Sequence, residues 1–422
     1  MGSHNVTGRP PRTAVIVGAG MVGLATAWHL QERGVDVTVL DRTGVAAGSS
    51  WGNAGWLTPG MAMPLSDPSL WTYGPKAILD PTAPLHIPAR LDPTLWSFLA
   101  RFAGHATHSA WRKAMAALTP IDRVALAAFD ELGAHGVTAT TNEGPFIVGF
   151  EREKESAGFI HEIHEVERAG QEVPLERLAN PRTMVPQLSE KVSTVFTMGG
   201  QRFIEPGPYV EALAKAVEER GGTIVSKASV TAVNKATQST DAGVTVHADG
   251  HDPFEADVVV LATGAWLPKL AKSLGVRTMI QAGRGYSFSV PTDEPARYPI
   301  YFPARRVACT PYQGRLRIAG TMEFRRPDEA LQPRRIDAIL ASVRDLFTGM
   351  DLDDRQDEWV GSRPVTPDGL PVIGETRTPG IYVAGGHGMW GIVLGPATGK
   401  LLAEQIVTGR VPDEIRPFNP LR

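Results

Sequence analysis

The stretch that decides the fold is TAVIVGAGMVGLATAWHLQERGVDVTVLD, residues 13–41. Its β-branched run at 13–17 predicts a strand, the glycines after it predict a turn, and the apolar spacing that follows predicts a helix. Gly34 ends the helix, and residues 35–40 predict a second strand that ends at Asp41. Strand, glycine turn, helix and strand in this order predict one βαβ unit of a parallel sheet.

The turn of this unit has the spacing Gly-x-Gly-x-x-Gly. Its first glycine permits a tight turn, its second lets the backbone approach a pyrophosphate, and its third lets the helix pack closely on the strand. The helix start adds unpaired N–H groups and a partial positive charge. We therefore expect the turn to bind the phosphates of a dinucleotide, and Asp41 to accept both ribose hydroxyls of an adenosine with a free 2′-hydroxyl. The residues of the turn are Gly18, Ala19, Gly20, Met21, Val22 and Gly23.

A second loop of small residues, GSSWGNAG at 48–55, follows Arg42. Its hydroxyl and N–H groups can hold the far phosphate and lie along a flat ring, and a nicotinamide enzyme needs no such loop here. An irregular Gly/Ser connection is the alternative interpretation. The loop thus favours FAD over NAD. The residues assigned to the cofactor in this region are Arg42, Ser49, Ser50, Asn53, Ala54, Gly55 and Trp56.

Length and composition exclude several classes of protein. A chain of 422 residues predicts more than one domain, and 42% apolar with 21% charged residues is typical of globular proteins. The net charge of -3 offers no basic stripe for nucleic acid, and the single cysteine, Cys309, cannot form an internal disulfide. No metal-ligand spacing, signal-peptide core or membrane-spanning apolar run is present in the sequence. We expect a soluble cytoplasmic protein, with attachment to the surface of the inner membrane as an open alternative.

Strands and helices typical of a parallel α/β sheet are predicted at the beginning, the middle and the end of the chain. A second unit is inserted between them. We predict an α/β fold, in which a Rossmann-like FAD-binding domain accompanies a discontinuous α+β substrate domain built on an antiparallel sheet. The FAD-binding domain is expected to comprise residues 13–58, 203–270 and 357–409. The substrate domain is expected to comprise residues 59–202 and 271–356.

Six motifs occur together and in order. They are VIVGAGMVGLA, SSWGNAG, Glu205-Pro206, LATGAW, RPVTPDGLPVIG and AGGHGMWGIVLGPATG. With them the chain resembles the FAD-dependent D-amino acid oxidase superfamily, above all its D-amino acid dehydrogenase, glycine oxidase and glyphosate oxidoreductase-like branches. The likeness extends over nearly the whole chain after Thr13.

The resemblance implies roles for individual residues. Arg363 would hold the substrate carboxylate through a bidentate ion pair, for which a structural salt bridge is the alternative. Val230 would contact adenine through its backbone, and Thr263 and Gly264 would form a further dinucleotide contact. A turn at a helix N-terminus, with N–H groups that face the flavin pyrimidine ring, is implied for Gly386, His387, Gly388, Met389, Trp390 and Gly391.

Tyrosines line the substrate pocket in this superfamily. Tyr286 and Tyr301 are the candidates here, Tyr312 is a weaker third, and ordinary packing in a sheet is the alternative for Tyr286. His387 and Trp56 adjoin matched loops and would line the cavity, or else lie behind the residues that do. We assign Arg363, Tyr286, Tyr301 and His387 to catalysis.

The implied reaction is oxidation of the C–N bond of a small amino acid by hydride transfer to flavin, from a D-amino acid to a 2-oxo acid and ammonia. An oxidoreductase of N-substituted glycines, such as sarcosine or glyphosate-like compounds, is the alternative. A nicotinamide dehydrogenase and a non-catalytic flavin subunit are the hypotheses from other classes. Cys309 lies outside the motif for covalent flavin attachment, so non-covalent FAD is expected, with oxygen or a quinone as electron acceptor. The oligomeric state stays open, and no metal is expected.

Overall fold

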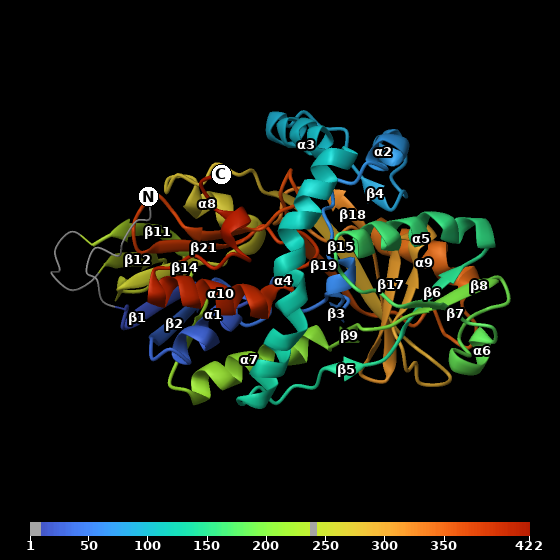
Figure 1. The fold of residues 1–422 in the computed structure, drawn as a ribbon, viewed down its shortest axis with the longest axis horizontal. Coiled ribbons are helices and arrows are strands. Elements are labelled where there is room, and N and C mark those ends of the chain that lie inside the picture. The colour runs from blue at the N-terminus through green and yellow to red at the C-terminus, as the bar shows by residue number, and fades with distance from the viewer. Residues whose placement is uncertain (1–9, 237–242) are drawn as a thin grey trace.

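The computed structural model describes residues 10–236 and 243–422. A six-stranded sheet lies on the left of Figure 1, with the strand order β10-β2-β1-β14-β21-β20. Its strands are parallel except for β20, which runs antiparallel to β21. Their bounds are β1 Thr13–Val17, β2 Asp36–Asp41, β10 Thr223–Ser226, β14 Val258–Leu261, β20 Val372–Glu375 and β21 Ile381–Gly385. The beginning, middle and end of the chain therefore meet in one sheet, as predicted.

Both faces of this sheet are buried, which explains the continuous apolar runs of its strands. Ala14 and Ile16 of β1 pack beneath the helices α1 Met21–Gln31, α7 Pro206–Glu219 and α10 Gly395–Thr408. Val15 and Val17 point the other way, toward a small antiparallel sheet. That sheet comprises β11 Val230–Lys235, β12 Val244–Ala248 and β13 Phe254–Ala256.

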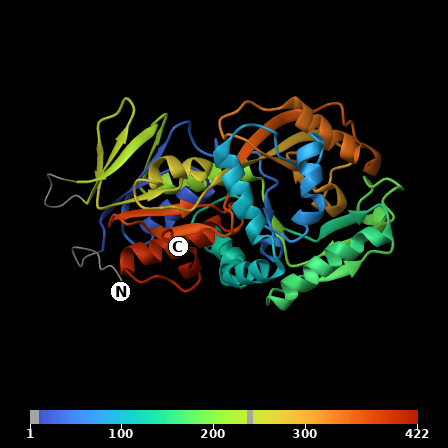
Figure 2. The same cartoon turned by 90° about the horizontal axis from the view of Figure 1, so that it is seen from above.

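A nine-stranded sheet, almost entirely antiparallel, forms the other half of the molecule (Figures 1 and 2). Its order is β19-β15-β18-β17-β16-β6-β8-β7, with β4 attached to β18. The bounds are β4 Leu85–His86, β6 Phe146–Phe150, β7 Leu175–Arg177, β8 Thr194–Met198, β15 Gln281–Pro291, β16 Ile300–Phe302, β17 Val307–Tyr312, β18 Arg315–Phe324 and β19 Gln356–Val365. Together with the parallel sheet, it confirms the predicted fold class. The division into two domains stays a prediction, and β19, which was assigned to the FAD-binding domain, pairs with β15 in this second sheet.

Helices and short segments complete the structure. The long helix α4 lies across the middle of the molecule in Figure 1, between the two sheets. The remaining helices are α2 Leu70–Leu79, α3 Pro93–His105, α4 His108–Ala134, α5 Glu153–Arg168, α6 Pro181–Met184, α8 Leu267–Ala271 and α9 Pro333–Val343. A small sheet contains β3 Trp56–Leu57, β5 Asn142–Glu143 and β9 Arg202–Phe203. Single 3₁₀ turns lie at Pro59–Met61, Gly264–Trp266, Pro303–Arg305, Arg344–Leu346 and Arg416–Phe418.

Candidate active site

A cavity of about 470 Å³ lies at the carboxyl ends of the parallel strands, where they face β15, β18 and β19. Turns that follow β1, β2 and β21, far apart in the sequence, line it together. The predicted cofactor residues that line it are Gly18, Gly20, Met21, Val22, Asp41, Arg42, Ser49, Ser50, Asn53, Ala54, Val230, Thr263, Gly264, His387, Gly388, Met389 and Gly391. Arg363 and Tyr286 line it as well. Ala19, Gly23, Gly55, Trp56, Tyr301, Gly386 and Trp390 are not among the residues that line the cavity.

The turn after β1 has the geometry that its glycines predict. Gly18 adopts a φ of +116°, and a Cβ at Gly23 would lie 1.9 Å from the Gly18 carbonyl oxygen. The helix α1 begins beyond Gly20 with no side-chain cap and no acidic residue in its first turn. Its N-terminus therefore presents N–H groups and a partial positive charge to the cavity.

Asp41 connects this turn to the end of β2. Its Oδ2 accepts a hydrogen bond from the Ala19 N–H at 2.9 Å, and its Oδ1 accepts from the N–H groups of Thr43 and Gly44 at 2.8 and 2.9 Å. A carboxylate has about four lone-pair sites, so the wall-lining Asp41 keeps acceptor capacity for hydroxyl groups. Beside it, the Arg42 guanidinium stacks on the Trp266 ring at 3.8 Å and lies 3.1 Å from Asp328.

The second loop packs against the first turn. Ser50 Oγ accepts a hydrogen bond from the Met21 N–H at 3.3 Å, and Ser49 Oγ donates to the Ser362 carbonyl at 2.6 Å. Trp56, at the end of the loop, makes edge contacts with the rings of Phe146 and Tyr301 at centroid distances of 5.0 and 5.4 Å. The structure thus places Trp56 and Tyr301 in an aromatic cluster.

The third turn lies between β21 and α10. Gly388 N–H donates to the Pro364 carbonyl at 3.0 Å, and the Trp390 indole donates to the Met63 carbonyl at 2.8 Å. His387 Nε2 lies 3.0 Å from Thr398 Oγ1, and burial lowers the pKa of His387 to about 4, so its ring is neutral at pH 7. The helix α10 starts at Gly395, so the turn lies before the helix and not at its first residue.

Arg363 crosses from β19 over β15 toward β18. Gly285 of β15 makes room for it, because a Cβ there would lie 2.2 Å from the guanidinium carbon. The Arg363 Nη1 donates to the Thr321 carbonyl at 3.3 Å, at a β-bulge where Thr321 has a φ of +53°. Within residues 10–236 and 243–422, no carboxylate lies within 4.0 Å of this guanidinium. Burial lowers its pKa to about 10, which leaves it charged at neutral pH.

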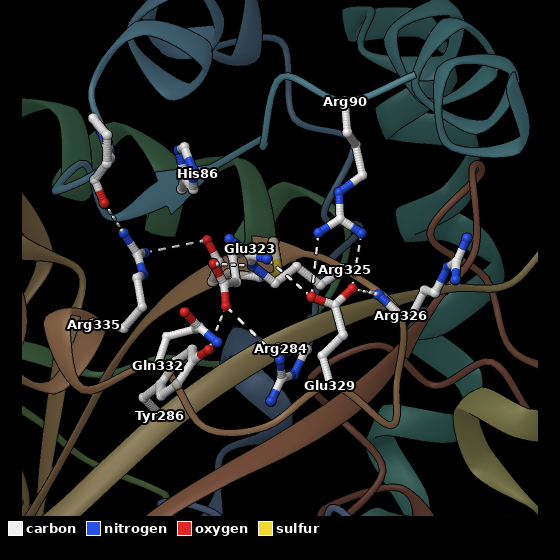
Figure 3. A network of polar contacts seen from close by, with 12 residues as sticks. His86, Arg90, Arg284, Tyr286, Glu323, Arg325, Arg326, Glu329, Gln332 and Arg335 are labelled. Atoms are coloured by element: carbon white, nitrogen blue, oxygen red, sulfur yellow. Dashed lines mark hydrogen bonds and ion pairs between the residues drawn. The ribbon is translucent and has the colours of Figure 1, made fainter. Parts of the chain in front are cut away.

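Tyr286 lies in a different environment, shown in Figure 3. Its hydroxyl donates a hydrogen bond to the buried carboxylate of Glu323, and burial together with this bond raises the pKa of Tyr286. Glu323 also accepts from Arg325 at 2.8 Å and lies 4.0 Å from Arg284. The hydroxyl of Tyr286 is therefore engaged by the protein, and its ring is the part that remains for contact with a ligand.

Comparisons with known proteins show the family of this chain. The family model described as FAD dependent oxidoreductase matches residues 13–405. The chain belongs to this FAD-dependent oxidoreductase family. It is 28% identical over 414 residues to a D-amino acid dehydrogenase of Azorhizobium caulinodans, covering 94% of this chain and 96% of that protein. It is also 30% identical to a D-amino acid dehydrogenase of Cereibacter sphaeroides, covering 94% and 92%.

Solved structures share the fold. A glycine oxidase from Geobacillus kaustophilus superposes with a TM-score of 0.73 at 22% identity, covering 98% of both chains. An L-proline dehydrogenase from P. horikoshii superposes with a TM-score of 0.70 at 16% identity, covering 98% of both chains. The chain is thus an FAD-dependent oxidoreductase with the Rossmann-like fold of this family, which confirms the cofactor and the enzyme class predicted from the sequence.

The residues of the cavity fit FAD. Thr263 lines the wall, and its buried Oγ1 has no hydrogen-bond partner among the described residues. The uncapped start of α1 and the Asp41 carboxylate suit a pyrophosphate and a ribose. Among the described residues, no group of three or more His, Cys, Asp or Glu could hold a metal ion. Cys309 is buried and free of any disulfide.

The FAD-dependent oxidoreductase also has site residues that the sequence did not indicate. Gly285 and Thr321 position Arg363, while Trp359 and Ala319 line the cavity. Two glycines inside the Gly-Arg-Gly-Tyr strand were the available signal, because strand glycines mark close approaches and bulges. None of the helices in the described parts of the chain has both the length and the apolarity to cross a bilayer.

Proposed function

We propose that this FAD-dependent oxidoreductase oxidises the C–N bond of a small D-amino acid, giving a 2-oxo acid and ammonia. Several relatives of 27–30% identity that span nearly the whole chain carry the name D-amino acid dehydrogenase. We assign the substrate carboxylate to Arg363, and we assign the dinucleotide to the three turns that line the cavity.

The observation that carries this proposal is the charge of Arg363. A partly buried guanidinium without a carboxylate partner is costly unless an anion from outside supplies the countercharge. A planar fork of N–H donors suits a carboxylate, which it binds through two parallel hydrogen bonds. Because Gly285 has no side chain, the Arg363 guanidinium can lie over it and line the same cavity as the cofactor turns.

The residues of the site orient the substrate, and none of them is placed to transfer a proton. FAD, when bound, supplies the chemistry by accepting a hydride from the substrate α-carbon. Arg363 holds the carboxylate and so orients the α-carbon. His387 is neutral above its pKa of about 4, and the Tyr286 hydroxyl is bonded to Glu323. The substrate amine is therefore expected to lose its proton to water before oxidation, with no side-chain base.

We propose a quinone or another carrier, in preference to oxygen, as the electron acceptor. The support is the name dehydrogenase that the relatives share.

Anaerobic bleaching of the bound flavin tests the substrate. Purified holoenzyme is mixed without oxygen with D-amino acids, L-amino acids, sarcosine and a glyphosate-like compound, and its absorbance near the flavin maximum is followed. We expect rapid bleaching with D-amino acids. Bleaching by sarcosine alone would establish the N-substituted glycine alternative, and a flavin that stays yellow with every compound would contradict oxidation of amino acids. Reoxidation of the bleached enzyme with oxygen or a quinone then distinguishes the two acceptors.

A further inference from the structure

Three neighbouring strands of the nine-stranded sheet each direct one side-chain donor at the loop 48–55. Ser287 Oγ of β15 donates to the Gly52 carbonyl at 2.8 Å. Arg317 Nη1 of β18 donates to the Trp51 carbonyl at 2.9 Å, and Thr310 Oγ1 of β17 donates to the Ala54 carbonyl at 2.6 Å. All three side chains are buried, with at most 2% of their surface exposed. We name Ser287, Thr310 and Arg317 the carbonyl clamp.

The strand register explains why these donors point the same way. Arg317 is paired with Thr310 on one side and with Ser289 on the other. Ser287 is two residues from Ser289 on the same strand, so its side chain emerges on the same face. The clamp is therefore a property of three paired strands far from the loop in sequence.

The clamp occupies three carbonyl groups of the loop. The carbonyls of residues 51, 52 and 54 are taken by the clamp, and the Gly55 carbonyl accepts from the Ile204 N–H at 2.8 Å. The N–H groups of Gly52 and Ala54 have no acceptor in the parts of the chain that the structure describes, and both residues line the cavity. Because both residues line the cavity, their unpaired N–H groups are available to an acceptor on a ligand.

Arg317 adds a charge behind the loop. Its guanidinium lies 3.6 Å from the Tyr312 ring centroid and 5.0 Å from that of Trp51. No carboxylate lies within 4.0 Å of it among residues 10–236 and 243–422. Burial lowers the pKa of Arg317, yet an arginine stays cationic in proteins. A positive potential behind unpaired N–H groups favours an acceptor that gains negative charge.

We propose that Ser287, Thr310 and Arg317 are positioning residues that turn the N–H groups of Gly52 and Ala54 toward the isoalloxazine end of FAD and so favour its reduced form. The inference rests on the proposed placement of FAD against loop 48–55. It links the nine-stranded sheet directly to the affinity and the reduction potential of the cofactor.

The test compares Ser287→Ala and Thr310→Val with the control Ser289→Ala. Ser289 is fully buried on the same strand, but its hydroxyl bonds Asp357 and not the loop. Three quantities are measured for each protein: the FAD dissociation constant, the midpoint potential of the bound flavin, and the melting temperature of the apoprotein. We expect roughly tenfold weaker FAD binding for Ser287→Ala, the loss typical of one hydrogen bond. The loss should be larger for Thr310→Val, because the Thr310 hydroxyl also accepts a hydrogen bond from the Trp56 indole at 2.8 Å. We also expect a more negative potential, with neither change in Ser289→Ala.

Thr310→Ser controls for misfolding of Thr310→Val. It keeps the hydroxyl group, so its FAD affinity and its midpoint potential should be close to those of wild type. Clamp variants that match Ser289→Ala in affinity and potential, in a protein whose wild type binds FAD, would overturn the clamp and leave the proposed function standing. A wild-type protein that takes up no FAD would overturn both.

Discussion

Two arginines on neighbouring strands, the buried Arg284 and the partly buried Arg363, have their charges compensated in different ways. Arg284 of β15 is 1% exposed, lies 4.0 Å from Glu323 and donates to the Ala330 carbonyl. Its surroundings form a network that extends through Arg325 and Glu329 to Arg90 of the segment before α3, as Figure 3 shows. Arg363 of β19 has the Thr321 carbonyl as its single hydrogen-bond acceptor among the described residues.

The difference separates a structural charge from a functional one. Removing a partner from a paired buried charge destabilises the fold, because the other charge is left uncompensated. Removing Arg363 leaves only the Thr321 carbonyl without its donor, and it leaves no opposite charge uncompensated. We therefore expect substitutions around Arg284 to change stability, and substitutions around Arg363 to change substrate capture.

The largest effect is expected for Arg363→Met. Loss of the carboxylate anchor should lower kcat/KM for the substrate about 10³-fold, the cost typical of losing a desolvated charge partner. The bound flavin spectrum and the free energy of unfolding should be retained. Steady-state kinetics and urea unfolding check both parts, and kcat/KM within about threefold of wild type would remove Arg363 from the account.

Glu323→Gln should act mainly on stability. The change removes the carboxylate that pairs with Arg325 and faces the buried Arg284, so the free energy of unfolding should fall by about 3 kcal/mol. Tyr286→Phe is the matched control, since it removes one hydrogen bond to Glu323 and should cost about 1 kcal/mol. Equal losses of stability in the two variants would show that the charge of Glu323 is not what the network depends on.

Gly285→Ala tests the opening through which Arg363 reaches the cavity. The added methyl group would overlap the guanidinium at 2.2 Å, so the anchor must move, and KM should rise about 10²-fold. Gly104→Ala, at a site where an added Cβ meets nothing within 4 Å, is the control. An unchanged KM in Gly285→Ala would mean that the guanidinium does not need its observed position.

The smallest effect concerns His387 and pH. Its folded pKa of about 4 lies below the unfolded value of 6.5, so the unfolded state binds more protons at acid pH. The stability that this group contributes is present above pH 6.5 and is lost as the pH falls toward 4. The loss in the free energy of unfolding is about 2 kcal/mol at pH 5. When the pH is lowered from 8 to 5, the free energy of unfolding of His387→Gln should fall by about 2 kcal/mol less than that of wild type. His29, with a folded pKa of about 3, retains a slope of the same sign in both proteins.

The parts of the site that sequence could predict are local in the chain. Gly18 and Gly23 lie within one turn, and Asp41 ends the next strand, so their placement follows from the βαβ unit alone. The loop at 48–55 and the turn at His387 were predicted as separate motifs, and the parallel sheet brings them together. Arg363 was assigned through the resemblance, and its roles, like those of Tyr286, Tyr301 and His387, stay predictions.

The remaining features depend on strand register, which no local pattern contains. The Arg363 side chain lies over Gly285 because β15 pairs with β19 in a register that places Arg363 opposite Gly283, two residues away. The bulge at Thr321, which turns its carbonyl toward Arg363, arises from the pairing of β15 with β18. The sequence predicts Tyr286 as a tyrosine of the substrate pocket, but its hydroxyl donates a hydrogen bond to Glu323, 37 residues away in the sequence.

The most direct test of the central claim pairs Arg363→Met with a substrate that lacks the carboxylate. Wild type and variant are each mixed anaerobically with a D-amino acid and with its amide, and the four rates of flavin bleaching are compared. Wild type should reduce with the acid at least 10²-fold faster than with the amide, and the variant should treat the two alike. A variant that still prefers the acid as strongly as wild type would show that another group holds the carboxylate.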